Sequence, residues 1–241
     1  MNHRVIEILL GATLAGMAFA AEPQRFVSGP ARVSLVELYT SEGCSSCPPA
    51  EKWLGTLRDD AGLWKSFVPV AFHVNYWDKL GWPDRFASRE GTQREYAYAE
   101  AWGSGNVYTP CFVRDGTEWK TRGEKIPAPG GPAAGTLTAS YDGAVLRAEF
   151  TPAAPRAGEK FEIHAALLGG GIVSKVTAGE NSGETLRHEF VALTFAHGAT
   201  GADVALPAPK LAGVSRRALA VWVTKRGELA PLQATGGWLA P

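Results

Sequence analysis

The sequence predicts a mixed α/β half followed by an antiparallel β half. Three observations lead to this fold class. Apolar strands alternate with segments of helical spacing up to residue 120, the cluster IPAPGGPAAG at residues 126–135 interrupts that pattern, and alternating strands with turn signals follow it. We therefore expect an α/β domain over residues 30–125, a linker over 126–135 and a β-rich, sandwich-like domain over 136–241.

The first half has the predicted order strand, helix, strand, helix, hairpin. The segments RVSLVELYT (32–40) and FVPVAFHVNYW (67–77) are apolar enough for strands that are buried on both faces. Apolar residues recur at helical spacing between positions 50 and 57, and residues 84–102 favour a second helix. The segment CFVRDGTEWK (111–120) predicts a hairpin around its Asp-Gly pair.

The second half carries the pattern of an all-β domain. The segment TLTASYDGAVLRAEF (136–150) predicts a hairpin on an Asp-Gly turn. Further alternating strands are expected in KFEIHAALL (160–168), ETLRHEFVALTF (184–195) and RRALAVWVTK (216–225). Several short strands with regular turns favour a small sandwich.

The amino terminus has the features of an export signal. His3 and Arg4 precede an apolar stretch that ends in the small-x-small pattern Ala18-Phe19-Ala20, so we expect cleavage after Ala20. The stretch is too short to span a bilayer comfortably, and no longer apolar run follows it. We expect a periplasmic or secreted protein without stable membrane insertion.

The net charge argues against some binding partners, and the cysteine count limits the number of disulfides. Lys plus Arg (24) balances Asp plus Glu (24), which gives no bulk electrostatic reason to bind nucleic acid or acidic membranes. Three cysteines form at most one disulfide and leave one thiol, which in an oxidising compartment is buried, reactive or metal-bound.

Two of the cysteines form a C-x-x-C pair between a predicted strand and a predicted helix. Near the free N–H groups and positive dipole end of a helix, a thiolate is stabilised, which favours Cys44 as the attacking thiol and Cys47 as the resolving one. Pro48 disfavours a helical conformation at Cys47, so the helix is expected to begin at or after Ser46. An inert disulfide and half of a metal site remain alternatives.

Four segments carry a resemblance to a known family. They are VELYTSEGCSSCPPAEKWL (36–54), FHVNYWDKLGWPDRFAS (72–88), VYTP (107–110) and GENSGETLRHE (179–189). Together they resemble a bacterial exported family known as domain of unknown function 1223, and the first half resembles the thioredoxin superfamily. The resemblance implies a thioredoxin-like domain with an appended antiparallel β-sandwich-like domain. It implies no established substrate.

The resemblance also implies roles for particular residues. Pro110 would be cis and face the cysteine pair, and the Thr109 backbone would pair with an extended substrate. Glu37 would assist proton transfer to the resolving thiol; the alternative is a carboxylate at the end of the sheet that reaches solvent. Cys111 departs from the family pattern. It is either a buried, inert thiol or a third sulfur for a soft metal, and His73 is either structural or functional.

Three functions follow from these residues. The first is an exported thiol-disulfide oxidoreductase that needs no cofactor and acts on protein thiols or disulfides in the cell envelope. The second is a copper(I)-binding or copper-delivery protein that uses Cys44 and Cys47 with either Cys111 or His73. The third is a non-enzymatic envelope binding module whose disulfide is structural. Whether the protein is an enzyme depends on which of the three applies.

Overall fold

The computed structural model describes residues 22–120, 125–128, 130, 132–155 and 157–240. The predicted signal peptide at residues 1–20, with its cleavage position, lies outside them. The helices are α1 (Pro48–Thr56) and α2 (Arg89–Ala101), with 3-10 turns at Leu57–Asp59 and Asp78–Leu80. The strands are β1 (Gln24–Val27), β2 (Ser34–Thr40), β3 (Phe67–His73), β4 (Cys111–Arg114), β5 (Thr117–Glu118), β6 (Gly135–Tyr141), β7 (Val145–Pro152), β8 (Phe161–Gly170), β9 (Ile172–Lys175), β10 (Thr185–His188), β11 (Val191–Ala199), β12 (Asp203–Ala205), β13 (Arg216–Lys225) and β14 (Pro231–Trp238).

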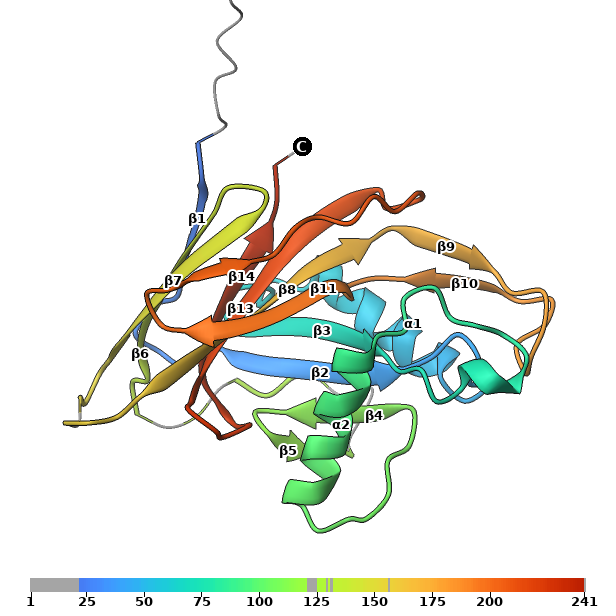
Figure 1. The fold of residues 1–241 in the computed structure, drawn as a ribbon, viewed down its shortest axis with the longest axis horizontal. Coiled ribbons are helices and arrows are strands. Elements are labelled where there is room, and N and C mark those ends of the chain that lie inside the picture. Colours follow the sequence, from blue (N-terminus) through green and yellow to red (C-terminus); the bar gives the residue numbers. More distant parts are fainter. Residues whose placement is uncertain (1–21, 121–124, 129, 131, 156, 241) are drawn as a thin grey trace, which may run out of the picture.

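The predicted fold class is wrong. One eight-stranded sheet, in the order β14-β13-β8-β11-β3-β2-β4-β5, takes strands from both halves of the sequence (Figure 1). Strand β11 joins the halves, because it pairs in parallel with β3 at Val191↔Ala71 and antiparallel with β8. The described chain is therefore mostly β, with a shared sheet in place of a thioredoxin-like α/β domain and an appended sandwich domain.

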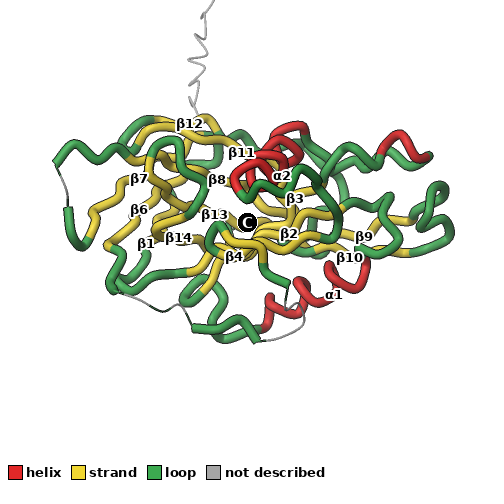
Figure 2. Tube along the Cα trace, turned by 90° about the horizontal axis from the view of Figure 1, so that it is seen from below, coloured by secondary structure: helices red, strands yellow, loops and turns green. Residues whose placement is uncertain are grey.

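The elements of the first half nevertheless occur in the expected order. Strands β2 and β3 are buried along their whole length, run in parallel, and are joined through α1. Helices α1 and α2 lie on opposite faces of this part of the sheet (Figure 2). The hairpin β4–β5 turns at Asp115 and Gly116, which both have positive φ. Helix α2 begins at Arg89, later than expected, and the Ser88 hydroxyl caps it by accepting from the N–H of Gly91.

A second sheet, β1-β6-β7-β12, packs against the second-half strands of the large sheet. Strand β13 alternates between two cores. Leu219, Val221 and Val223 face the second sheet, whereas Ala218 and Trp222 belong to the core of the first half. The two cores therefore share the strands of one sheet.

The segment 184–195 forms two strands instead of one. Strands β10 and β11 are separated by Phe190, whose φ of 58° interrupts the extended backbone. Strand β10 pairs with β9, and this hairpin runs beyond the carboxyl ends of β2 and β3 (Figure 1). Residues 176–184 connect the two strands and are called the β9–β10 loop below.

The predicted linker continues into the second sheet, since β6 begins at Gly135. Its described residues 126–128, 130 and 132–135 contain no helix, and residues 129 and 131 lie outside the described part. Within the described ranges, no helix is long and apolar enough to cross a membrane.

Candidate functional site

The cysteine pair lies in the turn that links β2 to α1. Cys44 and Cys47 form a disulfide with their Cα atoms 5.4 Å apart, and neither side chain is exposed. Helix α1 begins at Pro48, as the position of the prolines predicts. Its N-cap residue, Cys47, nevertheless has a right-handed helical backbone, with φ −79° and ψ −36°, which Pro48 was expected to disfavour. In the oxidised form the bridge is therefore covered.

The proline loop faces this bridge. The peptide bond between Thr109 and Pro110 is cis, and the Sγ atom of Cys44 lies 3.8 Å from the carbonyl oxygen of Thr109. The Ser46 hydroxyl lies 3.4 Å from the same oxygen. The indole N–H of Trp77 donates to the Thr109 hydroxyl at 2.8 Å, which fixes that side chain. The loop thus has the expected position, and the catalytic roles of Thr109 and Pro110 stay predictions.

The helix end offers fewer donors to a thiolate than the motif suggested. Pro48 and Pro49 have no N–H groups, and the N–H groups of Ala50 and Glu51 already donate to the carbonyl of Cys47 at 2.9 and 3.1 Å. A helix N-terminus stabilises an anion mainly through such free N–H groups. Its stabilisation of a Cys44 thiolate is correspondingly reduced.

The β9–β10 loop closes over the cysteine turn. The Glu180 carboxylate accepts from the Ser45 N–H at 3.0 Å and from the Ser45 hydroxyl at 2.8 Å. These bonds lower the pKa of Glu180, so a negative charge lies beside the pair. The Asn181 amide donates to the carbonyls of Glu42 and Cys44 at 2.8 and 2.9 Å. The second half of the chain therefore contributes directly to the surroundings of the disulfide.

Glu37 is bound to α2. Its carboxylate accepts from Arg94 Nε at 2.5 Å, from the Tyr98 hydroxyl at 2.7 Å and from the Tyr39 hydroxyl at 3.1 Å. All four side chains are buried. Glu37 is therefore not the solvent-reaching carboxylate of the alternative interpretation, and its role in proton transfer stays a prediction.

Cys111 points to the face that α2 covers. Its cross-strand partner is Tyr39, which packs on Tyr98 of α2, whereas the next residue, Phe112, packs on Trp53 of α1. Burial raises the pKa of the Cys111 thiol to about 12. These contacts favour a buried, inert thiol over a third sulfur beside Cys44 and Cys47.

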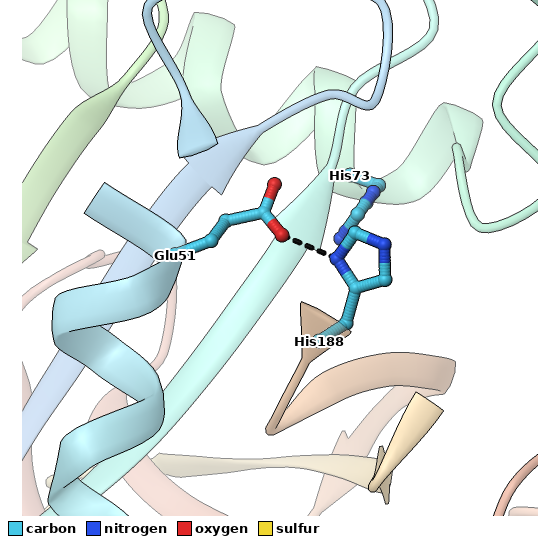
Figure 3. Close-up of side chains that lie close together, drawn as sticks. All are labelled: Glu51, His73 and His188. Atoms are coloured by element: carbon cyan, nitrogen blue, oxygen red, sulfur yellow. Dashed lines mark hydrogen bonds and ion pairs between the residues drawn. The ribbon is translucent and has the colours of Figure 1, made fainter. Parts of the chain in front are cut away.

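A buried cluster of acids and histidines lies at the carboxyl ends of β2 and β3. His188 bonds through Nδ1 to Glu51 and through Nε2 to Glu42, the latter at 3.1 Å. His73 bonds through Nδ1 to Asp84 at 2.6 Å, and Asp84 also accepts from the N–H of Glu42 at 2.8 Å. Glu51, His73 and His188 converge from α1, β3 and β10 (Figure 3).

The members of this cluster shift each other's pKa values. Burial alone would lower the pKa of His188, but the carboxylates of Glu51 and Glu42 raise it to about 10. Burial likewise opposes protonation of His73, and Asp84 outweighs it and raises that pKa. Burial opposes ionisation of Glu42, Glu51 and Asp84, whose histidine partners nevertheless lower their pKa values. In the absence of another cation, the cluster is an ion network.

Only His73 among these five residues was a candidate from the sequence. Glu42 and Glu51 flank the cysteines in the sequence, and His188 is far from them in a predicted strand. All five lie in three of the four segments that carry the family resemblance, which was the available signal. Their convergence requires β10 to lie against α1, a contact that no local pattern specifies.

Two solved structures share the fold. A crystal structure of a protein from Agrobacterium tumefaciens has a TM-score of 0.54 and 22% identity, covering 87% of this chain and 94% of that chain. A structure of HBP35 of Porphyromonas gingivalis has a TM-score of 0.53 and 14% identity, covering 88% of this chain and 76% of that chain. No curated protein matches this chain.

The sequence profile of one family matches most of the chain. The match covers residues 35–224, which include both cysteines of the pair, the proline loop and all five residues of the buried cluster. The chain belongs to the family described as "Protein of unknown function (DUF1223)".

Proposed function

We propose that the protein is an exported thiol-disulfide oxidoreductase that exchanges its Cys44–Cys47 bond with protein thiols or disulfides in the cell envelope. One observation carries the proposal. The disulfide lies in a turn at the N-terminus of α1, with the Sγ atom of Cys44 against the carbonyl of Thr109. An extended substrate chain that pairs with this loop would present its sulfur to Cys44.

The exchange proceeds through a mixed disulfide. In the reduced protein, the Cys44 thiolate attacks one sulfur of a substrate disulfide, whose S–S bond breaks, and the departing substrate thiolate takes up a proton. The Cys47 thiolate then attacks the Cys44 sulfur, releases the second substrate thiolate and closes the Cys44–Cys47 bond. Two electrons pass to the substrate, and the reverse sequence oxidises a substrate dithiol.

A partner reaches the buried sulfur atoms only after part of their surroundings has moved. Both cysteines are fully buried, and the loop is held on the cysteine turn by the bonds of Glu180 and Asn181. Glu180 is exposed, so its two bonds to Ser45 compete with water. We infer that the loop opens before a partner reaches Cys44.

The surroundings of the pair favour a low reduction potential. A strongly oxidising pair needs a stabilised thiolate, as in DsbA at about −120 mV. Here Pro48 and Pro49 remove donors, and the Glu180 carboxylate repels a negative charge on Cys44. We expect a potential between about −300 and −200 mV.

The first experiment is a redox titration. The purified protein is equilibrated in glutathione and dithiothreitol buffers, and free thiols are counted after acid quenching and unfolding. A reversible two-electron transition in the stated range supports exchange. Cys44→Ser and Cys47→Ser should each abolish it, and Cys111→Ser, the matched control, should leave the midpoint unchanged.

Two results would contradict the proposal. A bridge that stays oxidised well below −300 mV would indicate a structural disulfide and an envelope binding module. Unchanged reduction of a disulfide-bonded substrate protein by the Cys44→Ser variant would remove Cys44 from the reaction.

A further inference from the structure

We propose that Glu51, His73 and His188 form a binding site for a divalent first-row transition ion of the Zn²⁺ type. One oxygen and two nitrogen ligand atoms lie within 4.8 Å of one another, and all three residues are buried. Imidazole nitrogen and carboxylate oxygen form the ligand set of many zinc sites. The site involves no cysteine and is independent of the proposed exchange reaction.

His73 is the strongest indication of a ligand. Its side chain is fully buried, and its Nε2 atom has no hydrogen-bond partner, while its Nδ1 atom is held by Asp84 at 2.6 Å. A buried nitrogen without a partner costs free energy unless something binds it. A carboxylate behind one ring nitrogen, with the other nitrogen free, is the arrangement found for histidines that bind metals.

His188 differs in that both of its ring nitrogens contact carboxylates. Its Nε2 atom bonds to Glu42 at 3.1 Å, and its Nδ1 atom faces Glu51 (Figure 3). The second oxygen of Glu51 accepts from the Thr40 hydroxyl at 2.7 Å, which orients that carboxylate. Each of the three proposed ligands therefore has its own supporting hydrogen bond from outside the ligand set.

An ion would replace the hydrogen bond between His188 and Glu51. Ligand atoms about 2.1 Å from a tetrahedral ion lie about 3.4 Å apart. His188 Nδ1 and Glu51, which are now in hydrogen-bond contact, would have to move apart, whereas ligand atoms that are separated by up to 4.8 Å would have to move inward. Three buried carboxylates, those of Glu42, Glu51 and Asp84, offset the charge of a divalent ion. This charge balance favours a divalent over a monovalent cation.

A cavity adjoins two of the three proposed ligands. A cavity of about 840 Å³ is lined by residues of α1, the 3-10 turn after it, β9 and β10, and both Glu51 and His188 contribute to its wall. Three protein ligands leave at least one coordination position for water, which this cavity supplies.

The test is a zinc titration of the metal-stripped, purified protein by isothermal calorimetry. We expect one Zn²⁺ per chain, with unchanged affinity in the Cys44→Ser/Cys47→Ser double variant. His73→Gln and Glu51→Gln should each weaken binding at least tenfold. Asp84→Asn should weaken it by about 10- to 100-fold, as for other outer-shell carboxylates. His197→Gln is the matched control, because His197 is exposed on β11, and it should bind as the unmodified protein does.

Two further measurements separate ligand loss from misfolding. Co²⁺ in place of Zn²⁺ should give visible d–d absorption without the near-ultraviolet band of thiolate ligation. Zn²⁺ should raise the melting temperature of the protein but not that of Glu51→Gln, an isosteric change whose far-ultraviolet circular dichroism is compared first.

The proposal is overturned if no Zn²⁺ binds at micromolar concentration. It is also overturned if a folded His73→Gln variant binds normally or if the Co²⁺ complex shows a thiolate band. The redox titration of Cys44 and Cys47 does not depend on this result, so failure of one proposal leaves the other intact.

Discussion

Glu180 belongs to the second half of the chain, yet its carboxylate accepts both bonds from Ser45 inside the C-x-x-C motif. This contact brings a charge next to the residues that carry the proposed chemistry. It also ties the β9–β10 loop to the turn that contains the disulfide. We therefore expect the reactivity of Cys44 to depend on a residue far away in the sequence.

Replacing Glu180 with Gln should make reduced Cys44 more reactive. The substitution removes a negative charge beside the sulfur, so the thiolate fraction at neutral pH rises and alkylation by iodoacetamide should accelerate on the order of a few-fold. Stopped reactions followed by mass spectrometry measure the rate. Glu184→Gln is the control, since Glu184 is an exposed carboxylate of the same loop. An equal effect of both substitutions would mean that only the overall charge matters.

The sequence was sufficient to predict those site residues that lie together in one short motif. Cys44 and Cys47 lie within one turn, and the Thr109–Pro110 loop could be placed from the family resemblance. Glu51 and His188 could not be paired in this way, because 137 positions separate them. The pairing of this buried acid with this buried histidine can be recognised only from the three-dimensional structure.

At the scale of elements, α2 is attached to the sheet by a buried ion pair. Arg94 Nε lies 2.5 Å from Glu37 of β2, and burial opposes the charge on Arg94 while Glu37 raises its pKa. The Arg94 guanidinium also lies over the rings of Tyr98 and Trp222, at 5.2 and 5.1 Å. One side chain thus links α2, β2 and β13.

Arg94→Met should destabilise the protein by about 3–5 kcal/mol, because Glu37 would be left as an unpaired buried charge. Urea unfolding followed by circular dichroism measures the loss. Arg89→Met is the control, an exposed position at the start of the same helix, with an expected change within about 0.5 kcal/mol.

The redox behaviour of the stable Arg89→Met and the destabilised Arg94→Met proteins should be the same while both are folded. A fall of tenfold or more in the thiol exchange rate of folded Arg94→Met would instead support proton transfer through Glu37.

The boundaries of an element were predicted correctly where the apolar pattern of the segment agrees with its strand pairing. Strand β13 occupies the predicted segment 216–225, because its successive apolar side chains point alternately into two cores. The break between β10 and β11 within the segment 184–195 was not predicted, because the apolar pattern does not reveal that Phe190 takes a positive φ. The parallel pairing of β11 with β3 is likewise set by long-range packing, which the local sequence does not specify.

For the whole molecule, the shared sheet couples the stabilities of the two halves. The first-half core includes residues of β8, β13 and β14, and the strands that carry them also pack on the second sheet. A defect in the second half should therefore weaken the first half as well.

Leu219→Ala tests this coupling. Leu219 is fully buried between β13 and the second sheet, so its loss should cost about 2–5 kcal/mol. The probe is labelling of Cys111, a buried thiol of the first half, along a urea gradient. Its midpoint should fall together with that of circular dichroism. Val173→Ala, at a 44% exposed position of β9, should change neither. Two separate transitions would show that the halves unfold independently.

The position of β11 also has a consequence during synthesis. Strand β3 ends at His73, but β11, its neighbour on the side away from β2, begins only at Val191, so more than a hundred residues must be made before this edge is paired. Pairing of such distant segments is slow, and unpaired apolar edges associate between chains. A nascent chain of this protein therefore carries an open strand edge through much of its translation, and its escape from aggregation depends on how quickly the last third follows.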